Sequence, residues 1–372
     1  MSVVVAARRT AVGTAGHGHA HLDETALAAA VLVATAQDAA SVGCLPPRPG
    51  APEVVLGNAA GHGGNVARRA ALAGLGVDVP GLTVDRQCAS GLAAVAVGAA
   101  LIDAGQAGLV LAGGVESATR APARAHGTAP YDRASFAPPP WADPEAGEAA
   151  DRLARTHGIS RSRQHEHAVL AHRRALAAHR AGRFVREIVP AGTLRRDEHA
   201  RTLSDAVLAR LPGAFGPAGS VTAASAAPAA DGAAAVALVP DGVPGLRVRS
   251  AATCAGDPAM PLLAPVTAVR TVLGRAGATT RDVAAFEMVE AFAVQALAVS
   301  EQLGVDPASD ARWCPDGSTL ALGHPFGASG AICLVRLFAR LVHGGAPAGT
   351  LGVAASAATG GLGVAVLVEV VR

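Results

Sequence analysis

The sequence contains no lysine, since all 31 of its Lys or Arg side chains are arginine. A mechanism that forms a Schiff base on a lysine amine is therefore excluded. Aromatic residues make up only 3% of the chain, although 51% of the residues are hydrophobic. Alanine, glycine and valine must then build the core, and their small side chains require helices and strands to pack closely. The 372 residues are enough for two or three domains.

Cysteine is also scarce, and no C-x-x-C pair occurs. The wide spacing and odd number argue against a disulfide framework or a structural zinc site, and they fit a reducing cytoplasm. No long apolar segment precedes Arg8 and Arg9, so we expect no signal peptide. The net charge is +2 and the arginines are scattered, so we expect no nucleic-acid partner. The five cysteines are Cys44, Cys88, Cys254, Cys314 and Cys333.

One uncharged run, residues 350–368, is long enough to suggest a membrane span. Four glycines interrupt this run, and its ends are rich in β-branched residues. We therefore predict two buried strands around a turn, and no contact with a membrane.

Hydrophobic periodicity predicts strands that alternate with helices, which indicates an α/β sheet with helices on both faces. Strands are expected at 3–7, 53–56, 109–113, 285–288, 352–357 and 362–370, and helices at 22–40, 66–75, 92–104, 161–181 and 331–341. A Pro-rich connection is expected at 43–52. Residues 119–220 are loop-rich and Arg-rich, so we interpret them as an inserted loop domain. Residues 1–118 plus 221–247 form one half of the fold, and residues 248–372 form a second half of similar plan.

Cys88 lies where a strand-like run that ends at Val84 gives way to a run of small residues that begins at Ala89. A thiol at the N-terminus of a helix meets the positive end of the helix dipole and unpaired N–H groups. We therefore expect the thiolate, which is the nucleophilic form, to be favoured. The same N–H groups could bind an oxyanion.

His324 lies in the Gly- and Pro-rich stretch Leu-Ala-Leu-Gly-His-Pro-Phe-Gly-Ala-Ser-Gly at 320–330, directly before another helix. Cys88 and His324 thus occupy equivalent strand-to-helix turns in the two halves of the chain. Together they form a candidate pair of nucleophile and general base.

Other histidines are weaker candidates. His17, His19 and His21 lie close to Asp23 and could bind a metal from an extended segment, but an exposed polar loop is the favoured interpretation. His165 and His167 fall in a helix that looks exposed, and residues two apart do not share a helix face. We predict no metal site.

Long motifs in this chain resemble the thiolase family. They include R-Q-C-A-S-G-L around Cys88 and L-G-H-P-x-G-A-S-G around His324. G-G-V-E-S follows at 113–117, G-R-F-x-x-E-I-V-P at 182–190 and V-E-A-F-A at 289–293. The resemblance runs along nearly the whole chain. It implies a duplicated five-layered α-β-α-β-α architecture with the inserted loop domain covering the active site, and a homodimer or a dimer of dimers.

The resemblance also implies residue roles. Cys88 would take the acyl group from a thioester, with His324 as its base. The backbone N–H groups of Cys88 and Gly361 would form the oxyanion hole. The substrate would be a coenzyme A thioester, and no bound cofactor is expected.

Two departures from the family affect the second half-reaction. The cysteine that removes the α-proton of the attacking acyl-CoA aligns with Ala357, and adjacent Ser356 would point to the opposite side of a strand. The asparagine of the family's N-E-A-F aligns with Val289, and no asparagine occurs after Asn65 to replace it. Glu290 is a candidate base if it faces the cavity, but a structural carboxylate is the favoured interpretation.

Compared with the resembling family, this chain also has fewer side chains at the positions that contact coenzyme A. The family's serine in A-G-N-A-S-G aligns with Ala227, near Ala224, and its loop arginine aligns with Pro212. Ala227, Pro212 and Ala224 are therefore candidate coenzyme-binding positions by location only. The H-M-G of the family's loop aligns with Glu145, Ala146 and Gly147.

These observations predict a thiolase-like acyltransferase whose Cys88 takes an acyl group and passes it to an acceptor. Carbon–carbon bond formation or thiolysis is the family reaction. The departures leave open a decarboxylating condensation, an amine or alcohol acceptor, or hydrolysis, with coenzyme A or a carrier protein as donor. A non-catalytic scaffold subunit is the remaining alternative.

Overall fold

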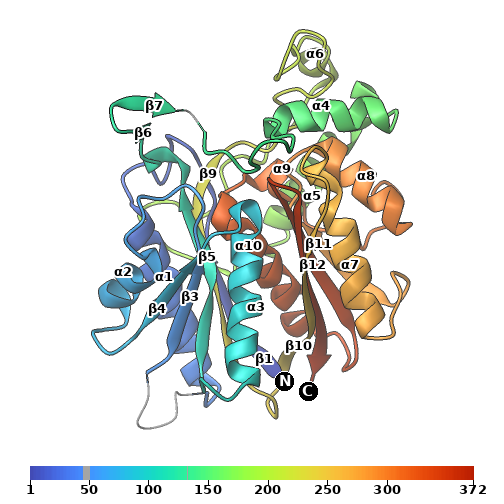
Figure 1. Cartoon of the computed structure of the whole chain (residues 1–372). Coiled ribbons are helices and arrows are strands. Elements are labelled where there is room, and N and C mark those ends of the chain that lie inside the picture. Colours follow the sequence, from blue (N-terminus) through green and yellow to red (C-terminus); the bar gives the residue numbers. More distant parts are fainter. Residues whose placement is uncertain (45–50, 132) are drawn as a thin grey trace.

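The computed structural model describes residues 1–44, 51–131 and 133–372, so the connection expected at 43–52 lies largely outside them. Its main sheet has the strand order β11-β12-β13-β10-β1-β9-β5-β3-β4. Helices cover both outer faces, and two helices run between the two halves of the sheet (Figure 1). These are the five layers that the sequence predicts.

The first half of the fold is built from strands that lie before residue 245 in the chain. Its α1 helix is capped by Asp23, whose carboxylate accepts a hydrogen bond from the backbone N–H of Ala26 at 2.8 Å. The strands are β1 (Ser2–Thr10), β9 (Ala230–Pro240), β5 (Val110–Ser117), β3 (Glu53–Gly57) and β4 (Gly81–Val84), with short β2 (Gly13–Thr14) and β8 (Ile188–Val189) at the rim, outer helices α1 (Glu24–Ser41) and α2 (Val66–Gly74), and inner helix α3 (Ser90–Asp103).

The second half repeats this plan. Strand β11 is parallel to β12 as β3 is to β5, and each half then adds antiparallel strands. Strand β10 pairs with both β13 and β1, which joins the halves into one sheet. The strands are β10 (Gly245–Ala255), β11 (Val283–Met288), β12 (Leu351–Ala358) and β13 (Leu362–Val371), with outer helices α7 (Ala264–Arg275) and α8 (Ala293–Leu303), short helix α9 (Thr319–Leu322) and inner helix α10 (Phe326–Phe338).

The uncharged run at 350–368 forms the antiparallel pair β12 and β13, as predicted, because its glycines allow the turn between them. Within the described ranges, one helical stretch, Phe326–His343, is long and apolar enough to cross a membrane. It includes α10, and 72% of it is buried inside the fold, as expected for a core helix.

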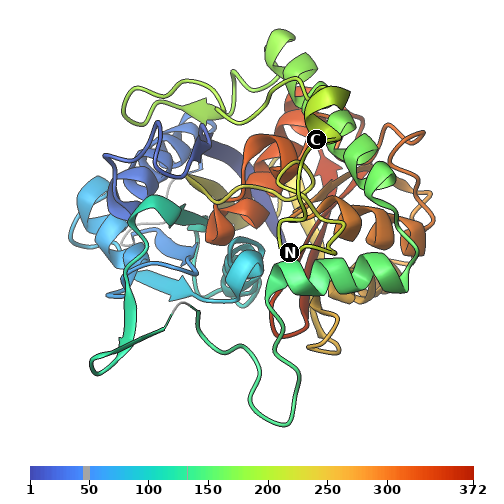
Figure 2. The same cartoon turned by 90° about the horizontal axis from the view of Figure 1, so that it is seen from above.

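Helices α3 and α10 lie side by side at the centre of the molecule, where the view from above shows them almost end-on (Figure 2). They approach closely because their contact residues are glycine. A Cβ atom on Gly91 of α3 would lie 2.8 Å from the carbonyl oxygen of Gly327 in α10. Larger side chains would separate the N-termini of these two helices, and with them the turns that carry Cys88 and His324.

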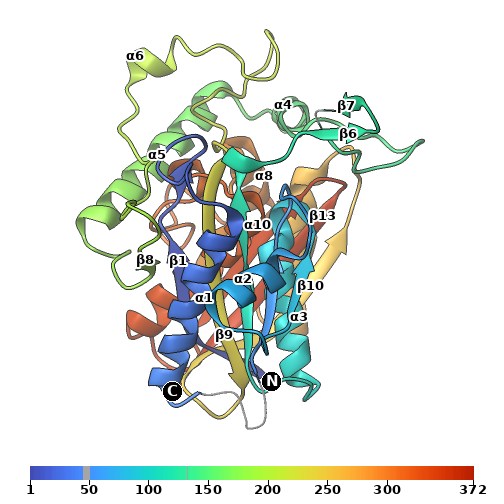
Figure 3. The ribbon, with the colours of Figure 1, turned by 90° about the vertical axis from the view of Figure 1, so that its left-hand side faces the viewer.

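The region between β5 and β9 crosses over one end of the layers (Figure 3). It contains the hairpin β6 (Arg124–His126) and β7 (Ala129–Tyr131) and the helices α4 (Ala146–Thr156), α5 (Arg161–Arg180) and α6 (Asp205–Leu208). Strand β9 then returns to the sheet between β1 and β5. The exact division into 1–118 plus 221–247, 119–220 and 248–372 stays a prediction.

The expectation that His165 and His167 lie on an exposed helix was wrong. Helix α5 packs against α8 and α9, and both histidines are buried on that side. Their Nε2 atoms lie 2.9 Å from the Thr222 Oγ1 and 2.9 Å from a Glu290 carboxylate oxygen, respectively. The Arg-rich composition of α5 concealed this buried polar side.

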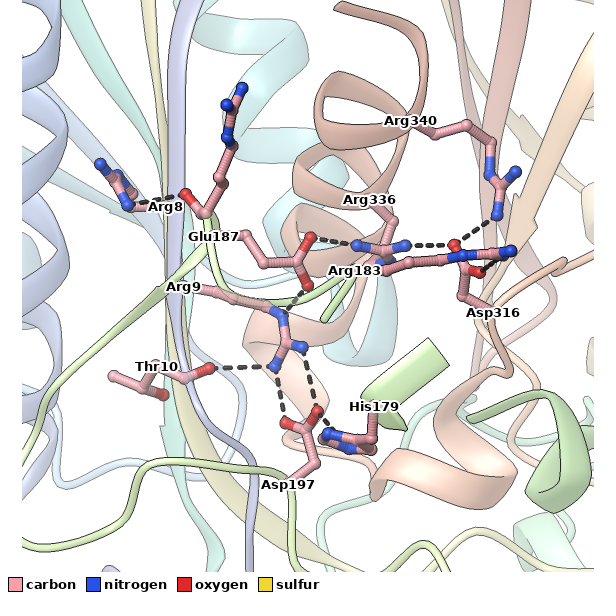
Figure 4. A network of polar contacts seen from close by, with 11 residues as sticks. Arg8, Arg9, Thr10, His179, Arg183, Glu187, Asp197, Asp316, Arg336 and Arg340 are labelled. Atoms are coloured by element: carbon pink, nitrogen blue, oxygen red, sulfur yellow. Dashed lines mark hydrogen bonds and ion pairs between the residues drawn. The ribbon is translucent and has the colours of Figure 1, made fainter. Parts of the chain in front are cut away.

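A buried ion network attaches the inserted region to both halves (Figure 4). Arg9 of β1 is fully buried and binds Glu187 at 2.7 Å and Asp197 at 2.6 Å. Glu187 also binds Arg336 of α10, which continues to Asp316. The network therefore connects the first strand, the inserted region and the inner helix of the second half.

We expect Arg9→Met to lower the free energy of unfolding by about 3–5 kcal/mol, because it leaves the buried Asp197 without its arginine and Glu187 with Arg336 alone. Arg8→Met is the matched control on the same strand. Its partner Asp38 and Arg8 itself are partly exposed, so the expected loss is about 1 kcal/mol or less. Urea unfolding midpoints measure both, and equal losses would contradict the assigned role of the buried network.

Candidate active site

Cys88 lies in a short 3-10 turn, Gln87–Ala89, between β4 and α3. The turn is fixed from both sides. The Ser90 hydroxyl accepts a hydrogen bond from the N–H of Arg86 at 2.7 Å and donates to the carbonyl of Gln87 at 2.6 Å. Ser356 of β12 donates to the carbonyl oxygen of Cys88 at 3.1 Å. The backbone that presents the thiol is therefore held by both halves of the fold.

The surroundings of Cys88 favour the thiol rather than the thiolate. Burial, and then the negative charge of Glu116, raise the pKa of Cys88 to about 12. The expectation that the helix N-terminus favours the thiolate was therefore wrong, because desolvation and the nearby carboxylate outweigh the helix dipole. Nucleophilic attack consequently requires a base that removes the proton.

His324 has the properties of such a base. Burial lowers its pKa to about 4, so the imidazole is neutral at pH 7. Its Nδ1 lies 2.7 Å from the hydroxyl oxygen of Ser329, which donates its own proton to the carbonyl of Pro325 at 3.1 Å. Ser329 can then only accept from Nδ1–H, so the lone pair is on Nε2. Nε2 is buried and has no hydrogen-bond partner among the described residues.

Glu116, at the end of β5, joins the segment after β3 to the N-terminus of α10. Its carboxylate accepts hydrogen bonds from the backbone N–H groups of Ala59 at 3.0 Å and Ala60 at 3.1 Å, and from the Asn58 side chain at 3.0 Å. It also accepts from the N–H of Gly327, three residues after His324, at 2.9 Å. Burial raises the pKa of Glu116 to about 7, against the lowering effect of these N–H groups.

A cavity of about 520 Å³ opens beside Cys88. One wall comes from the core of the fold and the other from the inserted region. The wall residues include Ala59, Ala60, Gln87, Phe326 and Thr359 on the core side and Pro122, Arg124, Tyr131, Arg133, Phe136 and Ala146 on the other.

In the turn between β12 and β13, Thr359 rather than Gly361 is a wall residue of this cavity. The Thr359 hydroxyl oxygen is buried and has no partner in the described part of the chain. Gly361 has a positive φ of 79° and its carbonyl accepts a hydrogen bond from Gly256 at 2.7 Å. The assignment of Gly361 to an oxyanion hole stays a prediction.

Glu290 does not line the cavity beside Cys88. Its carboxylate accepts hydrogen bonds from His167 at 2.9 Å and Trp313 at 2.7 Å, and from the Ser318 hydroxyl. Burial alone would raise the pKa of Glu290, but His167 and the two other donors hold it below the ordinary value. These contacts are those of a carboxylate that joins α5 to the second half.

The positions that depart from the family lie on or beside β12, in the segment beside His324, or in the inserted region. Val289 is buried and its N–H donates to the carbonyl of Ala355 at 2.9 Å, and Ala357 is buried on β12. Ala227 and Ala224 belong to the segment that runs beside His324, whose N–H donates to the carbonyl of Pro228 at 2.9 Å. Pro212 is exposed in the inserted region. None of the three candidate coenzyme positions lines the cavity of Cys88.

The N-terminal histidines do not converge on one point. His17 and His21 are exposed, whereas His19 is buried and its Nε2 lies 3.0 Å from the carbonyl oxygen of Ala11. The exposed-loop interpretation was therefore wrong for His19. Within residues 1–44, 51–131 and 133–372, no group of three or more His, Cys, Asp or Glu could hold a metal ion.

Three residues near the site were missed from the sequence. Glu116 could have been found, since it is the acidic residue of the G-G-V-E-S motif at the end of a buried strand. Thr359 could have been noticed as the side chain inside a glycine turn. Arg124 gave no signal, because its position follows from the path of the inserted hairpin.

Comparison with known proteins decides the family. The thiolase N-terminal domain matches residues 2–242, and the thiolase C-terminal domain matches residues 244–370. The chain belongs to the thiolase family. It is 42% identical over 330 residues to a Bacillus subtilis protein provisionally named acetyl-CoA C-acetyltransferase, covering 86% of this chain and 87% of the relative. It is 37% identical over 376 residues to an acetyl-CoA acetyltransferase of Pseudomonas aeruginosa, covering 92% and 93%.

The crystal structure of the Bacillus anthracis acetyl-CoA acetyltransferase superposes with a TM-score of 0.87 at 31% identity, over 100% of this chain and 98% of that one. This thiolase-family chain is thus an acyltransferase, and thioesters of coenzyme A are the substrates of the family. The five-layered fold expected from the sequence is confirmed.

We expect the rate constant for acylation of Cys88, at saturating acyl-CoA, to show no inflection between about pH 6 and pH 9. His324 is neutral above its pKa of about 4 and Cys88 stays protonated below about 12. The reactive pair of thiol and neutral imidazole therefore keeps one protonation state in this window, and the rate falls only when acid protonates His324. A single-turnover pH profile of the wild type and of Glu116→Gln measures this, because the pKa of Glu116 itself is about 7. A sigmoidal rise centred near pH 7 that persists in Glu116→Gln would instead indicate a thiolate–imidazolium pair.

Proposed function

We propose that Cys88 takes the acyl group of an acyl-CoA thioester, with Nε2 of His324 as the base. The observation that carries this proposal is the complementary state of the two groups, a thiol whose proton must be removed and a neutral imidazole with a free lone pair. The names of the relatives support acetyl-CoA among the donors. A carrier-protein thioester is the alternative donor.

In the acylation step, the sulfur of Cys88 attacks the thioester carbonyl and its proton moves to His324. The bond between the acyl carbon and the sulfur of coenzyme A then breaks, and the proton passes to the departing thiolate. This step needs neither the second cysteine nor the asparagine of the family.

The second step is proposed to differ from ordinary Claisen condensation, because Ala357 cannot remove an α-proton. Loss of a general base typically costs about 10²–10⁴-fold in rate, and loss of an oxyanion donor about 10²–10³-fold. A decarboxylating condensation, in which loss of CO₂ forms the enolate, avoids the need for the α-proton base. Transfer to an amine, an alcohol or water is the second candidate.

We further propose that the protein acts in the cytoplasm, where its five free cysteines would stay reduced. A homodimer or a dimer of dimers is proposed from family membership. The edge strand β4, where Leu82 is 45% exposed, supports an interface at that edge.

Acylation is tested by incubating the protein with a panel of acyl-CoA esters and measuring intact mass, followed by peptide mapping. We expect one acyl group on Cys88 and none in Cys88→Ala. If no ester of coenzyme A or of a carrier protein leaves an adduct, the acyl-transfer proposal fails and a scaffold role gains support.

The second half-reaction is tested by a gain of function. We expect Ala357→Cys to raise the exchange of acetyl-CoA α-protons with deuterium by at least about 10²-fold. Ala355→Cys, two residues earlier on the same face of β12, is the matched control. Equal exchange in the two variants would show that the missing cysteine does not limit the reaction. NMR or mass spectrometry of recovered acetyl-CoA measures the exchange.

A further inference from the structure

The cavity beside Cys88 is mostly apolar but carries two arginines, Arg124 and Arg133, on the wall that the inserted region supplies. No aspartate or glutamate is among the described residues that line it. Arginine is always charged in proteins, and its planar guanidinium matches a carboxylate with two parallel hydrogen bonds. The electrostatic character of the cavity therefore depends on whether each arginine is already neutralised.

Arg133 is neutralised by its own neighbours. It binds Asp143 at 3.1 Å and Glu145 at 2.6 Å, and its guanidinium lies over the ring of Phe136. Its role is to fix the loop that carries Phe136 and Ala146, two apolar wall residues. The positive charge of Arg133 is therefore already balanced by these two carboxylates.

Arg124 differs from Arg133. Its contact to the described residues is a long hydrogen bond of 3.4 Å from Nη2 to the carbonyl oxygen of Ala59, itself a wall residue. Within the described residues, which leave out Asp132, no carboxylate pairs with it. The β6–β7 pairing places Arg124 opposite Tyr131, and the stacked rings of Tyr131 and His126 shape the same hairpin. The hairpin thus holds a positive charge at the wall of the nucleophile's cavity.

We propose that the acyl group taken by Cys88 ends in a carboxylate, which Arg124 binds. This inference rests on the proposed acylation of Cys88 and names the class of its substrate, a dicarboxylic acid monothioester. An acyl chain on Cys88 occupies the cavity and displaces water from it. A neutral chain would leave the guanidinium desolvated without an anion, which is unfavourable, whereas a terminal carboxylate pairs with it.

The carboxylate takes no part in the bond changes. The sulfur of Cys88 forms the new thioester bond, the bond from the acyl carbon to coenzyme A breaks, and the proton of Cys88 leaves on the coenzyme thiol by way of His324. Nothing is oxidised or reduced. Arg124 is therefore a specificity-determining residue, whose effect falls on the acyl chain and not on the reacting atoms.

Arg124 could alternatively meet a phosphate of coenzyme A, and a matched pair of esters separates these two ligands. Succinyl-CoA and butyryl-CoA have acyl chains of four carbons and the same coenzyme, and they differ in the terminal carboxylate. We would measure single-turnover acylation of Cys88 by rapid quench and intact mass, for the wild type, Arg124→Gln and Arg120→Gln. Arg120 lies four residues earlier, donates to the carbonyl of Ala20 and does not line the cavity.

The wild type is expected to prefer succinyl-CoA over butyryl-CoA by about 10- to 100-fold in kcat/KM for acylation, as for one hydrogen-bonded charge pair. Arg124→Gln should abolish this preference, because succinyl-CoA loses its charge pair and butyryl-CoA no longer leaves a guanidinium without an anion. An unchanged urea unfolding midpoint shows that the variant is folded. Arg120→Gln should behave as the wild type.

Three results would overturn the inference. The wild type could show no preference for succinyl-CoA, or Arg124→Gln could keep the preference. Alternatively, Arg124→Gln could lower both rates equally, which would assign Arg124 to the coenzyme. In each case acetyl-CoA would still acylate Cys88, so the proposed function would stand. Failure of every ester to acylate Cys88 would instead remove the proposed function and this inference together.

Discussion

The carboxylate of Glu116 is the contact on which the geometry of the site depends. It is buried at the end of β5, and it accepts hydrogen bonds from the segment after β3 and from the N-terminus of α10. These two segments belong to different halves of the chain, so one side chain fixes the nucleophile's half against the base's half. The close approach of Gly91 to Gly327 then allows the two inner helices to meet. Together with the hydrogen bond from Ser356 to the carbonyl of Cys88, these features hold the Cys88 turn and the start of α10 in one arrangement.

The same carboxylate has a chemical consequence. A negative charge near a buried thiol disfavours the thiolate, and the raised pKa of Cys88 reflects both effects. The site therefore combines a protonated nucleophile with a neutral imidazole, whose orientation Ser329 fixes. A resting thiol of this kind is less open to oxidation than a thiolate. The carboxylate of Glu116 therefore both joins the two halves of the fold and disfavours the thiolate of Cys88.

The sequence predicted the layers and the strand-to-helix turn of Cys88 well, because both depend on local patterns. The strand-to-helix turn expected for His324 was wrong, since His324 lies between the short helix α9 and α10. Small apolar runs must be buried, and short motifs mark Cys88 and His324. It failed where burial depends on distant packing. His165 and His167 lie in an Arg-rich helix that looks exposed, yet α8 and α9 cover one side of it. The pKa of Cys88 was also mispredicted, because the helix N-terminus is visible in the sequence whereas the nearness of Glu116 is not. Arg124 reaches the cavity only through the path of its hairpin.

Ala357 and Val289 stand where the family has the cysteine and the asparagine of its second half-reaction. Their contacts show whether these two replacements disturb the residues proposed for acylation. The hydrogen bonds that hold Cys88 and His324 involve Ser90, Ser356, Ser329 and Glu116, and no side chain at position 289 or 357 takes part in them. The Ser356 hydroxyl also lies 3.0 Å from the backbone carbonyl oxygen of Ala357. Alanine at 357 and valine at 289 are therefore compatible with the side-chain contacts that hold Cys88 and His324. A chain that had lost all catalytic function would have no need for a neutral, oriented and buried imidazole and for a Cys88 turn that both halves of the fold hold in place. An enolate that forms by loss of CO₂ needs no α-proton base, which is why the proposed decarboxylating acceptor is compatible with alanine at position 357.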